Sequence, residues 1–243
     1  MDKLRINGGT PLFGEVKISG AKNAVLPIMA ATIIRPGRYT IKNVPNLRDT
    51  RTMISLIKET GAKISFAKNI LNIDTIECHN PVAPYNLVKT MRASFYMMGP
   101  FMSRFGKASV SLPGGCAWGP RPVNFHIEAL KKMGAKIQLK DGNIICAGKL
   151  QGSKIKFDKK SVGATGNIIM AAATAIGVTI IENAACEPEI EDLCNFMIKL
   201  GVKIDGVGTE ILTISPIENL EPLNIEFSVI PDRIEAGTFM IAA

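Results

Sequence analysis

Apolar side chains recur with a helical period in three separate stretches of this chain. In the first, Met53, Leu56 and Ile57 fall on one face of a helix, and the other two stretches show the same spacing. The predicted amphipathic helices cover residues 52–60, 123–133 and 193–200. Each is followed by a glycine, at positions 61, 134 and 201, and then by Ala or Val and Lys-Ile. Glycine at this place is typical of a helix C-terminus, so each helix is predicted to lead directly into a strand.

Each amphipathic helix is preceded by a more uniformly apolar helix and a strand. The predicted apolar helices are 24–34, 93–105 and 167–176, and the strands after them are 38–41, 108–112 and 178–181. A closing hairpin strand is predicted at 71–74, 143–147 and 211–214. This order of helices and strands recurs about every 70 residues and indicates an α/β fold of three βαβαββ repeats. Three units around a pseudo-threefold axis, with the helices inside and the sheets outside, would enclose the apolar helices. An ordinary two-layer α/β sandwich is the alternative.

The pattern starts again near the end of the chain. Asp-Arg-Ile-Glu-Ala-Gly at 232–237 precedes Met240-Ile241-Ala242-Ala243, which matches the Met-Ala-Ala anchors at Met29 and Met170. We therefore expect residues 22–229 to form one complete three-repeat domain. Residues 1–21 are expected to be the N-terminal piece of a second, incomplete domain, and residues 230–243 the start of its truncated part.

Composition narrows the functional classes. The chain has 243 residues, 47% of them hydrophobic, and a net charge of +8. That mixture excludes a disordered chain, and no apolar run reaches the roughly 18 residues of a spanning helix. The N-terminus lacks the apolar core of a signal peptide, so we expect a soluble, cytoplasmic protein without membrane partners. The basic residues are scattered and accompanied by Asp and Glu, which favours small anions over nucleic acid as ligands.

Cysteines, histidines and short motifs exclude other classes. Five cysteines, an odd number without a CxxC pair, argue against a disulfide framework. The two histidines, His79 and His126, do not give the ligand spacings of a zinc site, so no metal is expected. No GxGxxG, Walker A, HExxH or GxSxG motif occurs.

The loop at residues 112–122 contains the densest candidate chemistry. Three glycines and three prolines surround Cys116, and Arg121 stands where Pro122 opens a helix. An arginine and free N–H groups at a helix N-terminus attract anions and lower the pKa of a nearby thiol. The alternative is a surface loop with an incidental cysteine.

Basic residues also stand at the starts of the three apolar helices. Lys22 lies in a first turn, where a cation is unfavourable for the helix dipole and therefore suggests an anionic ligand. The alternative is a solvated lysine. Arg92 and Lys160 hold comparable positions in the second and third repeats, so the three cations are expected to converge at one end of the domain. Most of the acidic residues Asp49, Glu187, Glu189 and Glu191 are interpreted as solvated.

Six motifs together carry a resemblance to a known family. They are Ser-Gly-Ala-Lys-Asn at 19–23, Pro-Gly-Gly-Cys at 113–116, Arg-Pro-Val at 121–123, Ser-Val-Gly-Ala-Thr at 161–165, Glu-Pro-Glu-Ile at 187–190 and Pro-Asp-Arg-Ile-Glu-Ala-Gly-Thr at 231–238. Over its whole length the chain resembles the UDP-N-acetylglucosamine 1-carboxyvinyltransferases. The resemblance implies two inside-out α/β domains of three βαβαββ units each, with an active site between them. It implies transfer of the enolpyruvyl group of phosphoenolpyruvate to the 3-hydroxyl of UDP-N-acetylglucosamine, with release of phosphate and without a cofactor.

The resemblance also assigns roles to residues and a place in the cell. Lys22 and Arg121 would bind phosphoenolpyruvate, Asn23 and Arg92 would contact the sugar nucleotide or the intermediate, and Cys116 would be a lid thiol. Cys116 would donate a proton and react with fosfomycin. The uridine and the diphosphate would be held by Arg121, Pro122, Val123, Asn124 and Phe125 and by Lys160, Ser161, Val162 and Gly163. The reaction would start peptidoglycan synthesis, and through it serve cell wall formation, cell shape and division.

Three departures from the family pattern affect these expectations. Asn124 stands where the family has Asp, and Trp118 and Pro120 make the lid bulkier and stiffer. The family's general base lies in the second half of the protein, so this chain is expected to be inactive alone. A non-catalytic module that binds nucleotide sugars or anions remains an alternative. A shikimate-type enolpyruvyl transferase is another, although Pro-Gly-Gly-Cys argues against it.

Overall fold

The computed structural model describes residues 3, 5, 7–9, 11–112 and 123–242, and it contains three similar α/β units. The first unit consists of α1 (Lys22–Ala31), β1 (Gly37–Lys42), α2 (Arg48–Glu59), β2 (Lys63–Ala67) and β3 (Ile70–Asp74). The second consists of β4 (Val82–Ala83), α3 (Tyr85–Val88), the 3₁₀ helix η1 (Arg92–Met97), α4 (Met98–Phe105), β5 (Lys107–Ser111), α5 (Asn124–Lys132), β6 (Lys136–Lys140) and β7 (Asn143–Ala147). The third consists of β8 (Lys154–Lys156), α6 (Val162–Ala172), β9 (Thr179–Glu182), α7 (Pro188–Lys199), β10 (Lys203–Asp205) and β11 (Ile211–Ser215). The strand β12 (Leu223–Ser228) and the helix α8 (Arg233–Ala242) follow.

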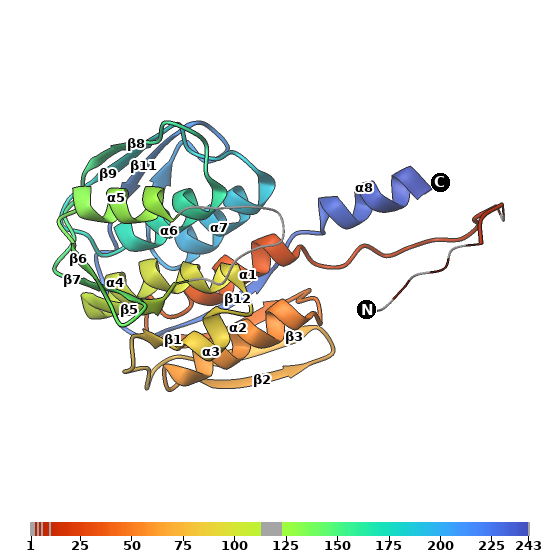
Figure 1. The fold of residues 1–243 in the computed structure, drawn as a ribbon, viewed down its shortest axis with the longest axis horizontal. Coiled ribbons are helices and arrows are strands. Elements are labelled where there is room, and N and C mark those ends of the chain that lie inside the picture. The colour runs from red at the N-terminus through yellow and green to blue at the C-terminus, as the bar shows by residue number, and fades with distance from the viewer. Residues whose placement is uncertain (1–2, 4, 6, 10, 113–122, 243) are drawn as a thin grey trace.

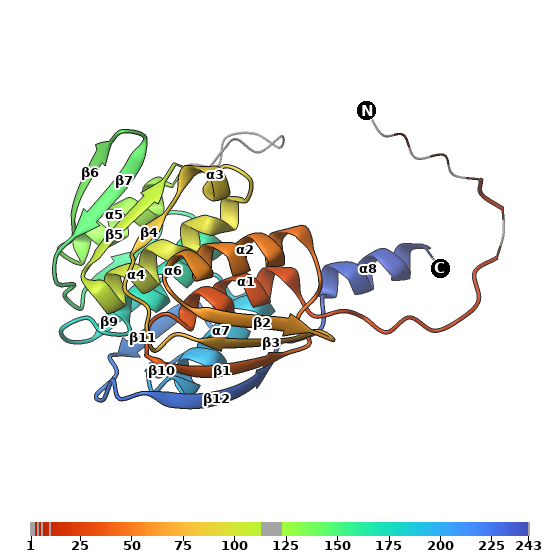
Figure 2. The ribbon, with the colours of Figure 1, turned by 90° about the horizontal axis from the view of Figure 1, so that it is seen from below.

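Each unit has a four-stranded sheet with the same strand order. The orders are β12-β1-β3-β2, β4-β5-β7-β6 and β8-β9-β11-β10. In every sheet the first strand runs parallel to the second, and the remaining pairs are antiparallel. The first unit obtains its leading strand from β12, which lies beside β1 in Figure 2. The predicted βαβαββ repeat is therefore confirmed, with one strand of the first unit supplied by a much later part of the chain.

The helices lie inside and the sheets lie outside, as Figure 1 shows. Eight consecutive residues of α1, from Ala24 to Ala31, are buried, and so are nine consecutive residues of α6, from Ala164 to Ala172. A helix that is apolar on every face is stable only when it is enclosed on every side. The inside-out arrangement is thus confirmed, and the two-layer sandwich alternative is wrong.

The glycines after the amphipathic helices have the predicted role. Gly61, Gly134 and Gly201 have φ values of 99°, 90° and 101°, the left-handed conformation that favours glycine at a helix end. The apolar helix predicted over 93–105 is instead divided into η1 and α4. Pro100 has no N–H to donate to the carbonyl of Tyr96, so a continuous α-helix would lack a hydrogen bond there.

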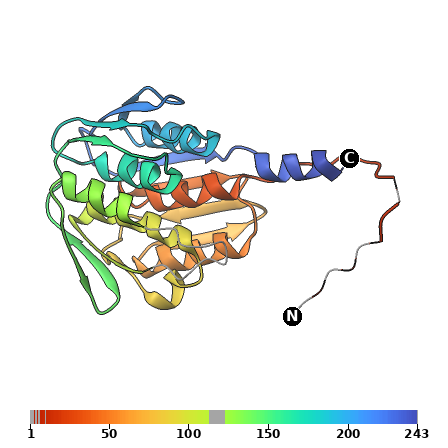
Figure 3. The ribbon, with the colours of Figure 1, turned by 45° about the horizontal axis from the view of Figure 1, so that its top comes forward.

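The segments that enter and leave the three-unit body cross each other, and we call residues 19–21 and 230–232 the crossing. Ala21 N–H donates to the Ile230 carbonyl at 2.8 Å, and Asp232 N–H donates to the Ser19 carbonyl at 2.8 Å. Beyond the crossing, α8 and the N-terminal segment extend away from the body, and α8 has no buried residue (Figure 3). The predicted domain boundaries at 21/22 and 229/230 fall at the crossing and stay predictions.

Candidate functional site

The first predicted cation, Lys22, opens α1 and is surrounded by carboxylates. The preceding residue, Ala21, offers no side-chain cap. Asp232 accepts a hydrogen bond from the Lys22 backbone N–H at 3.3 Å, and Asp49 of α2 lies 3.2 Å from Lys22 Nζ. These carboxylates offset the unfavourable position of a cation at a helix N-terminus. Asp49, one of four acidic residues of which most were expected to be solvated, is 32% exposed and pairs with Lys22, because α2 packs beside α1.

A cavity of about 400 Å³ lies at this end of the central helices, and we call it the Lys22 cavity. Its lining includes Lys22 and Asn23 of α1, Arg92 of η1, Val123 and His126 beside or in α5, and Gly163 of α6. All three units therefore contribute to one cavity. The helix starts converge because the inside-out arrangement places the N-termini of α1, η1 and α6 at the same end of the core.

A second cavity of about 760 Å³ adjoins the first, and we call it the Lys160 cavity. Arg92, His126 and Gly163 line both cavities, so these three residues form the wall between them. The remaining lining includes Asn124, Phe125, Lys159, Lys160, Ser161 and Val162. Ser161 caps α6 by accepting a hydrogen bond from the Ala164 N–H at 3.3 Å. A positive charge and the start of a buried helix together form an environment that suits a phosphate group.

Lys160 is paired with Glu210 across the mouth of the third unit. Its Nζ lies 2.6 Å from Glu210 Oε1, and this hydrogen bond raises the pKa of Lys160. The side chain is 46% exposed, so it stays accessible to a ligand.

The structure brings most of the predicted site residues together. Lys22, Asn23, Arg92, Val123, Asn124, Phe125, Lys160, Ser161, Val162 and Gly163 all line one or both cavities. Cys116, Arg121 and Pro122 lie outside the described residues, as do Trp118 and Pro120. The convergence of Lys22, Arg92 and Lys160 at one end of the domain is confirmed, and their individual roles stay predictions.

His126 lines both cavities, and the sequence did not single it out as a candidate. It is 7% exposed, and its ring stacks edge-on against Phe95 with 4.9 Å between the centroids. Burial, and secondarily the positive charge of Arg92, lower the pKa of His126 to about 3, so the ring is neutral at physiological pH. The available signal was its position, one residue after Phe125 on the same predicted helix as three proposed site residues.

A smaller cavity of about 220 Å³ lies on the other side of Asn23 and Tyr96, next to the start of α7. Here Glu189 is 4% exposed, and Arg233 Nε lies 3.0 and 3.3 Å from its two carboxylate oxygens. The interpretation of Glu189 as solvated is wrong, because residues 230–233 fold back over α7 and cover it. Burial and the neighbouring carboxylates raise the pKa of Tyr96.

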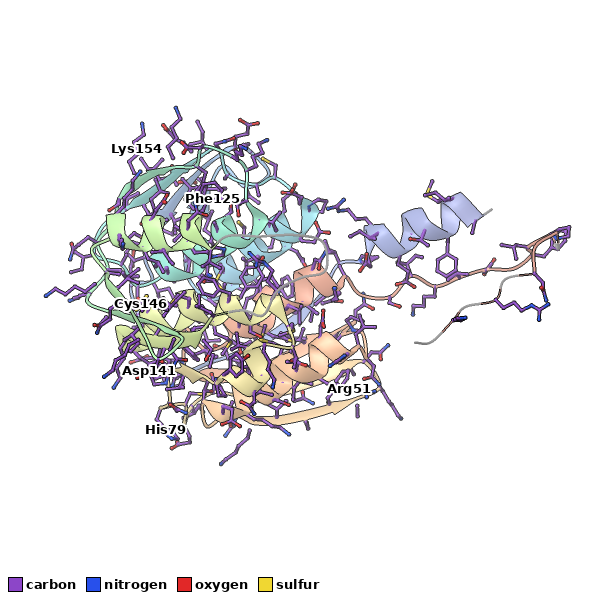
Figure 4. The ribbon with its side chains drawn as sticks, viewed as in Figure 1. Arg51, His79, Phe125, Asp141, Cys146 and Lys154 are labelled. Atoms are coloured by element: carbon purple, nitrogen blue, oxygen red, sulfur yellow. The ribbon has the colours of Figure 1, made fainter. Side chains whose placement is uncertain are left out.

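The cysteines and histidines in the described part of the chain form no cluster of metal ligands. Among the described residues, no three His, Cys, Asp or Glu side chains gather closely enough to hold a metal ion. The four described cysteines are free, and burial raises the pKa of Cys146 of β7, which Figure 4 labels. His79 is exposed and lies far from Phe125 in the same view. The described part of the chain also contains no helix with the length and apolar character needed to cross a bilayer.

Sequence comparison places the chain among enolpyruvyl transferases. The sequence model for EPSP synthase (3-phosphoshikimate 1-carboxyvinyltransferase) matches residues 6–243. Two curated relatives are 54% identical over the whole chain, from Thermodesulfovibrio yellowstonii and Geotalea uraniireducens, and both are named UDP-N-acetylglucosamine 1-carboxyvinyltransferase. The chain spans 58% of the length of each of these relatives.

Solved structures share the fold at much lower sequence identity. The enolpyruvyl transferase NikO from Streptomyces tendae superposes on 98% of this chain with a TM-score of 0.86 and 22% identity, over 56% of its own chain. An EPSP synthase from Acinetobacter baumannii superposes on 95% of the chain with a TM-score of 0.74 and 18% identity, over 53% of its own chain. These likenesses concern the fold, which is the inside-out arrangement of three βαβαββ units described above.

Proposed function

This chain belongs to the EPSP synthase family of enolpyruvyl transferases, and on that premise we propose that it serves the transfer of an enolpyruvyl group to UDP-N-acetylglucosamine. The donor is phosphoenolpyruvate, the acceptor is the 3-hydroxyl of the sugar, and phosphate is released. The reaction belongs to the start of peptidoglycan synthesis in the cytoplasm, and through it to cell wall formation, cell shape and division. Because the chain spans 58% of its curated relatives, the proposal concerns the whole protein.

The observation that carries the proposal is 54% identity, over all of this chain, to proteins named for this reaction. The geometry agrees with it. Two adjoining cavities, with Lys22 in one and Lys160 in the other, match a reaction between two anionic substrates. A cationic cleft raises the local concentration of such substrates.

The larger Lys160 cavity suits the diphosphate of the nucleotide sugar. Lys160 and the start of α6 supply positive charge and N–H donors there. The Lys22 cavity suits the carboxylate and phosphate of phosphoenolpyruvate, with Asn23 beside Lys22 to contact the sugar. Because the two cavities adjoin, the sugar of a nucleotide bound in one can reach phosphoenolpyruvate bound in the other. Holding two reactants in contact in this way supplies much of the rate acceleration of a bimolecular reaction.

The chemistry is an addition followed by an elimination. The sugar oxygen bonds to carbon 2 of phosphoenolpyruvate while carbon 3 gains a proton, and the hydroxyl proton passes to a base. Carbon 3 then loses a proton as the bond from carbon 2 to the phosphate oxygen breaks. By the family resemblance, Cys116 donates the proton to carbon 3, and Lys22 and Arg121 stabilise the charges of the intermediate. The same resemblance makes Cys116 the site at which fosfomycin reacts.

Phosphate release by the full-length protein tests the proposal. With phosphoenolpyruvate and UDP-N-acetylglucosamine we expect one phosphate per enolpyruvyl product, and no release when shikimate 3-phosphate replaces the nucleotide sugar. Lys22→Ala should lower kcat/KM by at least about 100-fold, since it removes a cation from the developing charge. Release with shikimate 3-phosphate alone would favour the shikimate-type alternative. Binding of the nucleotide sugar without any release would favour a non-catalytic binding module.

A further inference from the structure

Two backbone groups determine which way the side-chain amide of Asn167 is oriented. Its Oδ1 accepts a hydrogen bond from the Gly99 N–H at 2.7 Å, and its Nδ2 donates to the Phe95 carbonyl at 2.9 Å. A flipped amide would set acceptor against acceptor and donor against donor. Asn167 is fully buried in α6, where such mismatches are costly.

The second hydrogen of Asn167 Nδ2 determines the tautomer of His126. The Nδ2 atom lies 2.9 Å from His126 Nδ1, and because Nδ2 can only donate, Nδ1 must accept. A neutral imidazole with an acceptor at Nδ1 carries its proton at Nε2. His126 therefore presents an N–H donor at Nε2, and none of the described residues accepts a hydrogen bond from it.

The Nε2 edge of the His126 ring faces the start of α6. It is left uncovered there because Gly163 has no side chain. A Cβ atom built on Gly163 would lie 3.3 Å from both Nε2 and Cε1 of His126, so any larger residue would cover this edge. His126, Gly163 and Arg92 are also the three residues common to the two cavities. The donor thus stands at the wall between them, beside the cationic part of the Lys160 cavity.

We propose that His126 is a substrate-binding residue that donates a hydrogen bond from neutral Nε2–H to a phosphate oxygen of the nucleotide sugar, with its tautomer set by Asn167. The inference rests on the proposed function and adds a recognition residue to it. A phosphate oxygen is the favoured acceptor because Lys160, Arg92 and the α6 N-terminus attract negative charge to this wall. A neutral donor suits the position, because a second cation beside Arg92 would be repelled.

Two substitutions separate the donor from the packing of the ring. His126→Asn keeps a polar atom near the Nδ1 position for Asn167 but has no donor at the Nε2 position. His126→Gln places its amide N–H₂ near the Nε2 position. With the full-length protein and isothermal titration calorimetry, we expect His126→Asn to weaken binding of UDP-N-acetylglucosamine and of UDP at least tenfold. His126→Gln should bind both within about threefold of the wild type. His79→Asn, at the exposed histidine, is the control and should bind normally.

Several results would overturn the inference. Equal affinity losses in the Asn and Gln variants, with matching losses of melting temperature, would reduce His126 to a packing residue. Weaker binding of UDP-N-acetylglucosamine with unchanged binding of UDP would move the contact from the diphosphate to the sugar. Imidazole ¹⁵N NMR of the wild type, assigned by comparison with His126→Asn, should show Nε2 protonated and Nδ1 bare, and a proton on Nδ1 would contradict the argument. If the wild type binds neither ligand, the proposed function itself fails.

Discussion

At the scale of single residues, Glu189 and Asp192 near the start of α7 are both buried, but their carboxylates have different partners. Glu189 forms an ion pair with Arg233. Asp192 is 4% exposed and accepts a hydrogen bond only from the Ile230 backbone N–H among the described groups. Burial, and secondarily the charge of Glu189, raise the pKa of Asp192 from 3.8 to about 6. The Asp192 carboxyl therefore keeps its proton in mildly acidic solution.

This pKa gives the stability a pH dependence of definite sign. Between pH 4 and pH 6 the folded state holds the proton of Asp192 and the unfolded state releases it. The contribution of Asp192 to the free energy of unfolding therefore falls as the pH rises, by at most about 1.4 kcal/mol per pH unit. Asp192→Asn should remove this loss, so its stability relative to the wild type should increase from pH 4 to pH 6.

Urea unfolding at several pH values measures this difference. Asp205→Asn, at an exposed strand end, is the matched control and should follow the wild-type profile. A constant difference between Asp192→Asn and the wild type across pH 4 to 7 would show that Asp192 has an ordinary pKa in the folded protein.

The sequence predicted the positions of some site residues but not the contacts of others. The cationic helix starts were predictable, because the cost of Lys22 in a first turn is local. The partners of Asp49, Glu189 and His126 were not, since each depends on a neighbour brought by tertiary packing. Asn167 and His126 are 41 positions apart and belong to different units.

At the scale of elements, α4 and α6 approach so closely that one residue has no room for a side chain. A Cβ atom on Gly99 would lie 2.4 Å from the Asn167 carbonyl oxygen and 2.7 Å from Asn167 Oδ1. The neighbouring atom is backbone in a buried helix and cannot move aside. This contact also supplies the N–H that orients Asn167.

Gly99→Ala should therefore separate the two helices. We expect a loss of about 1–3 kcal/mol in the free energy of unfolding, the range for overpacked cores. Gly237→Ala is the control, because Gly237 is also helical but a Cβ atom added to it would meet no other atom within 4 Å. It should leave the unfolding midpoint unchanged or raise it slightly, since Ala is the better helix former. A Gly99→Ala protein as stable as the wild type would contradict the close packing.

Most elements were predictable because their signals are periodic and local. The amphipathic helices, their terminal glycines and the hairpin strands all follow from short-range pattern. The leading strands β4 and β8 were not predicted from the sequence, because they are two and three residues long and show little apolar periodicity. The division between η1 and α4 also escaped, although Pro100 was its visible cause.

At the scale of the whole molecule, Arg233 connects the exit from the crossing to α7. Its partner Glu189 has a side chain that is only 5% exposed, whereas the Arg233 side chain is 53% exposed. Removing the arginine would leave a buried carboxylate without a cation. The segment that carries α8 would lose one of its polar contacts with the body.

Arg233→Gln should accordingly destabilise the protein by about 2 kcal/mol, below the range for fully buried pairs because the arginine is partly solvated. Glu189→Gln combined with Arg233→Gln should recover part of that loss, since no buried charge remains. Denaturant unfolding of the wild type, both single variants and the double variant gives the coupling energy. Strictly additive effects would show that the ion pair contributes nothing of its own.

The overall architecture was predictable because the same order of helices and strands occurs three times along the chain. What the repeat alone did not predict was the source of the first unit's leading strand. That source follows from closing three units into a ring. In the ring, β12 pairs in parallel with β1, just as β4 pairs with β5 and β8 pairs with β9.

Closing the ring with β12 has a consequence for the order of events during synthesis. Gly37 pairs with Leu223, so the first sheet waits for a strand 186 positions later in the chain. At ribosomal rates of about 5–20 residues per second, that wait is roughly 10–40 s. Throughout it, the nascent chain exposes one open edge of β1, the kind of edge to which other chains can add. The unit that emerges first is therefore the last to be completed.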